Sequence, residues 1–150
     1  AATGDVLLVL HADTLLPDGF DDMVVAALRG ETLATCFRFA VDRDALPFGP
    51  ASWRRFLREL PFDVMERTVA WRAGPLQLPF GDQALALRRR TFEVLGGFDD
   101  LARVPILEDF LLVHRLRVAG AARGAPAIAT LAAPARCHPR RWLARPVWRV

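Results

Sequence analysis

The chain has 150 residues, of which 53% are hydrophobic and 25% are charged. A chain of this length corresponds to about one domain, and this composition excludes an intrinsically disordered protein. The net charge is +3 and lysine is absent, so all the positive side chains are arginines. An arginine-only repertoire is weak evidence for nucleic-acid binding, and no nucleic-acid partner is expected.

Cys36 and Cys137 are too few for a disulfide framework and form no CxxC motif, so we expect two ordinary thiols in a cytoplasmic protein. No apolar run approaches the roughly 18 residues that span a bilayer. No signal peptide is visible at the start. The chain opens almost directly on a strand of the buried type, which leads us to expect a piece of a longer protein.

Apolar periodicity alternates between strands and helices along the chain, which favours an α/β architecture. Strands are predicted at residues 6–10, 33–41, 84–87 and 127–131. Helices are predicted over residues 17–28, 52–60, 64–72, 91–95 and 108–119. Pro61 is expected to interrupt or restart the second helix. Glycines are expected to end the other helices, at Gly30, Gly96-Gly97 and Gly120.

The most informative stretch is the apolar run at 6–10, which leads directly into His11-Ala12-Asp13-Thr14. A continuous apolar run is typical of a strand that is buried on both faces. Open α/β sheets bind ligands beyond the carboxyl ends of such strands. At positions i and i+2, His11 and Asp13 share one face of an extended strand end. Asp13 suits a hard divalent cation, and His11 suits a borderline metal or a phosphate. The spacing supports equally well a simple cap of the following turn by Asp13.

Glu108-Asp109 opens a predicted helix. Carboxylates are favoured at a helix N-terminus by the macrodipole, and that structural explanation is the better one for the pair taken alone. The functional explanation is that one of the two carboxylates is a general base that deprotonates an attacking hydroxyl.

Two further polar segments could contact a ligand. Gly81 permits close approach of the backbone, and Asp82 and Gln83 offer hydrogen bonds, although a tight turn explains the three residues as well. The basic segment at 138–142 suits a diphosphate, although a solvated basic tail explains it too. His114, within the last helix, is interpreted as structural.

Taken in order, these segments resemble the family 2 glycosyltransferases with a GT-A fold, and most closely the small bacterial-type enzymes whose strand ends in HADT instead of DxD. The resemblance covers Gly4 to about Trp142. It rests on the order of His11-Ala12-Asp13-Thr14, Pro17, Gly81-Asp82-Gln83, Gly96-Gly97-Phe98, Glu108-Asp109 and Arg140-Arg141-Trp142. It implies a partial GT-A fold: a Rossmann-like mixed sheet with flanking helices. Residues 1–150 would then be the C-terminal, catalytic part of one domain, and the nucleotide-binding half would precede Ala1.

The resemblance also implies roles for single residues. Asp109, supported by Glu108, would be the catalytic base. Asp13 and His138 would lie at a divalent cation, Mg²⁺ or Mn²⁺, on the donor diphosphate. The remaining substrate-binding residues would be His11, Gly81, Asp82, Gln83, Gly97, Arg140, Arg141 and Trp142. His138 stands where processive members of the family have the glutamine of a QxxRW motif.

The implied reaction is metal-assisted, inverting transfer of a sugar from a nucleotide-diphosphate-sugar donor to the hydroxyl of an unknown acceptor. The alternative is a non-catalytic or degenerate GT-A fragment that binds an anion or a partner protein through its arginine-rich tail. Association with a membrane surface through Trp142, Leu143, Val147 and Trp148 is disfavoured, because Pro146 interrupts this short segment.

Overall fold

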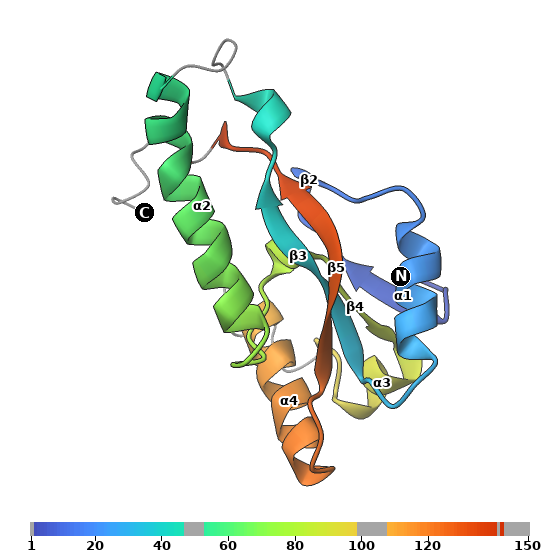
Figure 1. The fold of residues 1–150 in the computed structure, drawn as a ribbon. Helices are drawn as coiled ribbons and strands as arrows, with labels where there is room; N and C mark the ends of the chain where they lie inside the picture. Colours follow the sequence, from blue (N-terminus) through green and yellow to red (C-terminus); the bar gives the residue numbers. More distant parts are fainter. Residues whose placement is uncertain (1, 47–52, 99–107, 141, 143–150) are drawn as a thin grey trace.

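The computed structural model describes residues 2–46, 53–98, 108–140 and 142, apart from the side chains of 53–59 and 108 (Figure 1). In this part of the chain, helices flank one mixed sheet, so the predicted α/β class is confirmed. The strands are β1 (Val6–Val9), β2 (Thr14–Leu15), β3 (Ala34–Val41), β4 (Leu85–Arg88) and β5 (Ile128–Cys137). The helices are α1 (Phe20–Leu28), α2 (Trp53–Ala73), α3 (Arg89–Val94) and α4 (Glu108–Ala122), with short 3-10 turns η1 (Arg43–Ala45) and η2 (Gly81–Gln83).

The sheet has the strand order β1-β4-β3-β5-β2. β3 and β5 are parallel and run side by side along the sheet, whereas β4 is antiparallel to both β1 and β3. It follows that β1, β3 and β5 point the same way. The carboxyl ends of β1 and β5 and the amino end of β4 therefore face the same end of the sheet.

β1 and β2 lie at opposite edges of the sheet, yet only residues 10–13 separate them in sequence. Four strand spacings of a flat sheet amount to about 19 Å. The link spans at most about 18 Å when fully extended. It is not extended, because the Thr14 N–H donates to the His11 carbonyl oxygen, closing a turn. The sheet must therefore curl, so that the link crosses in front of the amino end of β4.

Core side chains cover both faces of the sheet. On one face Val24 and Leu28 of α1 pack against Phe37 and the small side chains of Ala84 and Ala86. On the other face α4 packs Leu112, Val113 and Leu116 against β3 and β4; the partners are Ala34, Cys36, Leu85 and Leu87. Figure 1 shows α1 and α4 on opposite sides of the sheet. Burial on both faces explains why Leu85, Ala86 and Leu87 of β4 are all apolar.

The helix α2 runs without a break through Pro61, so the predicted interruption is wrong. A proline inside a helix costs about 3 kcal/mol. Tertiary packing offsets that cost, because Phe62, Met65 and Val69 on the following turns pack against Phe39 and Val41 of β3.

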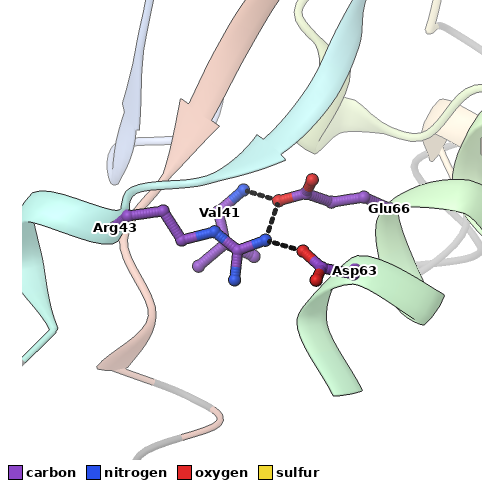
Figure 2. Close-up of polar contacts among 4 residues, drawn as sticks. All are labelled: Val41, Arg43, Asp63 and Glu66. Atoms are coloured by element: carbon purple, nitrogen blue, oxygen red, sulfur yellow. Dashed lines mark hydrogen bonds and ion pairs between the residues drawn. The ribbon is translucent and has the colours of Figure 1, made fainter. Parts of the chain in front are cut away.

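Polar contacts fix α2 against the end of β3 (Figure 2). Glu66 Oε1 accepts the Val41 backbone N–H at 2.8 Å and lies 3.1 Å from Arg43 Nη2. Asp63 Oδ1 accepts from the same Arg43 nitrogen at 2.7 Å. Because Val41 is buried, Glu66 satisfies a backbone donor that the strand leaves without a ladder partner.

Several element boundaries differ from the predicted ones. β5 continues from residue 131 to Cys137, and the short strand β2 was not predicted; the two pair with each other, Thr14 opposite Cys137. α1 begins at Phe20 instead of Pro17. α4 continues through Gly120, where a Cβ would lie 2.8 Å from the Ala125 carbonyl oxygen. Gly120 thus allows a close approach of the chain that follows and does not end the helix.

Within the described residues, none of the helices combines the length and the apolar character needed to cross a membrane.

We expect Glu66→Ala to lower the free energy of unfolding by about 1–3 kcal/mol, because it leaves the buried Val41 N–H without a partner. Asp63→Ala is the matched control. Its side chain is 48% exposed, and loss of such an ion pair costs about 0–1 kcal/mol. Urea unfolding of both variants measures the difference. Equal losses would show that the backbone hydrogen bond of Glu66 contributes nothing beyond the surface ion pair.

Candidate functional site

Segments far apart in the sequence meet at the end of the sheet that the link from β1 to β2 crosses. They are the link itself, the turn η2 before β4, residues 138–140 after β5 and the first turn of α4. An open hollow of about 760 Å³ lies here, lined by Leu10, His11, Ala12, Asp13 and Arg140. The hollow therefore brings together the polar residues predicted at the end of β1 and those of the basic tail.

Asp13 and Arg140, which both line the hollow, form an ion pair. Asp13 Oδ2 accepts from Arg140 Nη2 at 2.9 Å and from Arg140 Nε at 3.0 Å. The backbone also joins the two segments, because the His138 N–H donates to the Asp13 carbonyl oxygen at 3.0 Å. His138 Nδ1 in turn accepts the Arg140 backbone N–H at 3.1 Å. The Arg140 side chain is still 68% exposed, so its guanidinium can reach a ligand.

His11 lies directly against the turn η2. A Cβ built on Gly81 would be 2.6 Å from His11 Nε2, which is closer than real Cβ contacts allow. Glycine at position 81 therefore makes room for the imidazole. Since His11 also lines the hollow, it connects the hollow to the residues around η2.

Asp109, in the first turn of α4, is held by two backbone donors. Its Oδ2 accepts the Gly81 N–H at 3.1 Å, and its Oδ1 accepts the Phe110 N–H at 2.7 Å. Both bonds fix the orientation of the carboxylate at the edge of η2. Asp109 and the His11–Asp13 segment are thus on the same end of the sheet, on either side of Gly81.

Asp82 is half-buried beside these groups. Burial raises the pKa of its carboxyl, and the nearby Arg72 and His11 partly oppose that rise. Its Oδ1 is buried, and no described residue donates a hydrogen bond to it. Burial likewise lowers the pKa of Arg72, which Asp82 and Asp109 partly restore through their negative charge.

Two contacts of the Cys137 thiol hold β2, β5 and η2 together. The Cys137 thiol lies 3.1 Å from Thr14 Oγ1 and donates to the Asp82 carbonyl oxygen at 3.3 Å. Burial raises the pKa of Cys137 to about 11, so this thiol stays protonated and acts as a donor. Cys137 was predicted to be an ordinary thiol, and a structural hydrogen-bonding role agrees with that prediction.

Other residues predicted to bind substrate have structural contacts. Gln83 is fully buried, and its Nε2 donates to the Phe37 carbonyl oxygen at 3.1 Å. Trp142 packs edge-to-face on Phe39 and Phe62, at centroid distances of 6.2 Å and 6.3 Å.

Gly97 does not join the cluster. It lies at the end of α3 with a φ of 53°, and its carbonyl oxygen accepts from Arg115. Arg141 and the side chain of Glu108 fall outside the described residues, so their predicted roles stay predictions.

The predicted cation site has few protein ligands. In the described part of the chain, no three His, Cys, Asp or Glu side chains are grouped so as to hold a metal ion. Asp13 shares its Oδ2 with Arg140, and His138 Nδ1 is engaged with the Arg140 N–H. The residues therefore fit a cation such as Mg²⁺ only in the arrangement where one carboxylate and substrate phosphates supply the ligands.

Arg72 was not among the predicted site residues. It is one of several arginines in a long amphipathic helix, and its neighbours in sequence carry no motif. Only the fold brings it next to Asp82 and Asp109, which come from two other elements.

We expect Asp82→Asn to gain stability relative to the wild type as the pH rises. The pKa of Asp82 is raised in the folded state. The protonated carboxyl therefore contributes to the free energy of unfolding in full below the unfolded pKa of about 3.9, and this contribution is lost as the pH rises through the folded pKa. The asparagine variant does not ionise and keeps its stability. Urea unfolding at several pH values between about 4 and 7 measures the difference, and a constant difference over that range would contradict the expectation.

The chain matches no family model, no curated protein and no solved structure. What the site does has therefore to be inferred from its own residues: an aspartate–arginine pair at an open hollow, a histidine against a glycine turn, and two further carboxylates around a half-buried arginine.

Proposed function

We propose that the protein transfers a sugar from a nucleotide-diphosphate-sugar donor to an acceptor hydroxyl, with inversion, and that its sheet is part of a GT-A fold. The observation that carries the proposal is that His11 and Asp109 both contact Gly81, while His11 lines the same hollow as the Asp13–Arg140 pair. These residues are the separate motifs on which the resemblance to family 2 glycosyltransferases rests. Motifs that resembled the family by chance would not be expected to lie close together in the fold.

The donor diphosphate binds in the hollow beside Arg140. Guanidinium groups bind phosphate oxygens in a bidentate manner, and the exposed side chain of Arg140 is held at the hollow by Asp13. His11 on the same wall adds a hydrogen bond to a phosphate or to the donor sugar. As the glycosidic C–O bond breaks, negative charge grows on the leaving diphosphate, and Arg140 stabilises it.

A divalent cation, when bound, would neutralise the diphosphate further as a Lewis acid. Asp13 would supply its carboxylate ligand, with most other ligands coming from the donor phosphates. In the structure, Arg140 pairs with the Asp13 carboxylate.

Asp109 takes the proton from the acceptor hydroxyl. The acceptor oxygen attacks the anomeric carbon from the face opposite the diphosphate, the diphosphate leaves with the bonding electrons, and the hydroxyl proton passes to the Asp109 carboxylate. The two backbone N–H groups that hold Asp109 fix it in the orientation that a general base requires. One displacement with one base inverts the configuration of the anomeric carbon.

We expect UDP- or GDP-sugar binding to depend on Mn²⁺ and to be lost in Asp13→Ala, because this variant removes both the cation ligand and the partner that positions Arg140. Isothermal titration calorimetry with and without the metal measures this. Asp44→Ala is the matched control. The Asp44 carboxylate forms an exposed ion pair with Arg136, with an N–O distance of 3.1 Å, and neither residue lines the hollow. Metal-independent binding of any polyanion that weakens steeply with salt would instead support the anion-binding alternative.

We expect Asp109→Asn to lower turnover by about 10²–10⁴-fold, the usual contribution of a positioned base. Asparagine has nearly the same size as aspartate, so the donor dissociation constant should stay within about twofold of the wild-type value. A tenfold change in that constant would correspond to about 1.4 kcal/mol of binding free energy. Rates of nucleotide release in the presence of acceptor measure the first quantity. Unchanged turnover would exclude Asp109 as the base.

A further inference from the structure

The long helix α2 carries a second apolar face that the sheet does not cover. Its inner face packs Phe62 and Val69 against the end of β3. On its outer face Leu60, Val64 and Trp71 are 45%, 56% and 60% exposed. Figure 1 shows α2 along one side of the sheet. Single exposed apolar side chains are ordinary, but a stripe of them along one helix is typical of a contact surface.

The stripe has the spacing of a helix–helix seam. Leu60, Val64, Arg67 and Trp71 follow one another at intervals of four, three and four residues, so they occupy the a and d positions of a heptad pattern. Thr68 lies beside Val64 on the next turn, and its hydroxyl donates to the Val64 carbonyl oxygen at 2.8 Å. Because this hydroxyl is satisfied within the helix, it does not oppose contact with an apolar surface.

The seam is complementary to itself when two copies of α2 run antiparallel. With a two-fold axis midway between residues 65 and 66, residues whose numbers add up to 131 face each other. Leu60 then packs against Trp71 of the second copy, and Val64 packs against the aliphatic stem of Arg67 of the second copy. Each copy contributes the same surface, as a two-fold interface requires.

The charges beside the seam select this occupant and this orientation. In the antiparallel pair, the guanidinium of Arg67 comes beside Asp63 of the second copy. The Asp63 side chain is 48% exposed, and one of its oxygens accepts from Arg43 of its own chain. A parallel pair would instead bring two Arg67 guanidiniums together in the seam. Anionic lipid would gain little, because the charges of Asp63 and Arg67 cancel along this face.

We propose that the face of α2 formed by Leu60, Val64, Arg67 and Trp71 binds the same face of a second copy, which gives an antiparallel, two-fold homodimer. The seam spans 11 residues, or about 16 Å. Such a short seam belongs to the small, weak class of interfaces, with a dissociation constant of about 10–1,000 μM. None of the four residues lines the hollow, so the dimer does not rest on the proposed function.

Sedimentation equilibrium of the chain at about 10 μM to 1 mM tests the proposal, with the dissociation constant as its readout. We expect the average mass to rise from one chain towards two. Val64→Arg places a second guanidinium against Arg67 of the partner copy, and Trp71→Ala removes the largest apolar contact; each should raise the dissociation constant about tenfold or more. Val94→Arg is the matched control, because Val94 is 79% exposed on α3, and it should dimerise like the wild type.

A chain that stays monomeric at 1 mM overturns the proposal. An unchanged dissociation constant in Val64→Arg also overturns it, because another surface would then hold the dimer. Growth beyond two chains does so as well, since a two-fold contact is closed. Urea unfolding of each variant provides the folding control, and we expect unchanged stability because the substituted side chains are exposed.

Disulfide cross-linking tests the orientation. In the antiparallel dimer, an equal mixture of Leu60→Cys and Trp71→Cys chains should form a mixed disulfide under mild oxidation faster than either variant forms one alone. The native cysteines are both buried and provide the background, measured with the wild-type chain. Faster cross-linking of Leu60→Cys with itself would show a parallel pair and overturn the antiparallel arrangement.

Discussion

The link from β1 to β2 is the constraint on which the rest of the structure depends. It joins the two edge strands of the sheet with residues 10–13, so the sheet must curl and the link must cross the amino end of β4. His11 is thereby pressed against Gly81, and Asp13 is brought beside Arg140. A longer link would let β1 and β2 lie on a flat sheet and would leave these residues apart.

Backbone groups do much of the positioning at the site. The N–H of Gly81 holds the Asp109 carboxylate, the N–H of His138 holds the Asp13 carbonyl, and the Asp82 carbonyl receives the Cys137 thiol. Among the described residues, Asp82 Oδ1 and Arg72 Nη1 are buried and have no hydrogen-bond partner. A site arranged in this way is preorganised by its backbone framework.

The sequence predicts what local chemistry decides. The strand at the start of the chain, the polar tip at His11 and Asp13, and the start of α4 at Glu108 follow from apolar runs and charge at helix ends. Prediction from the sequence is wrong where tertiary packing determines the conformation. Pro61 is kept inside α2 by contacts with β3, and β5 continues to Cys137 because β3 pairs with it along this stretch and β2 pairs with its end. Arg72 could not be found, since its neighbours at the site come from other elements.

The two cysteines offer a practical consequence. Both are buried, and burial raises the pKa of each thiol to about 11, so at neutral pH almost none of either is the thiolate that reacts with maleimides. A cysteine introduced at an exposed position, such as Val94 on α3 with 79% of its surface accessible, would react first. A fluorophore can thus be attached at one chosen position while the native thiols, including the one that joins β5 to β2 and η2, are left in place.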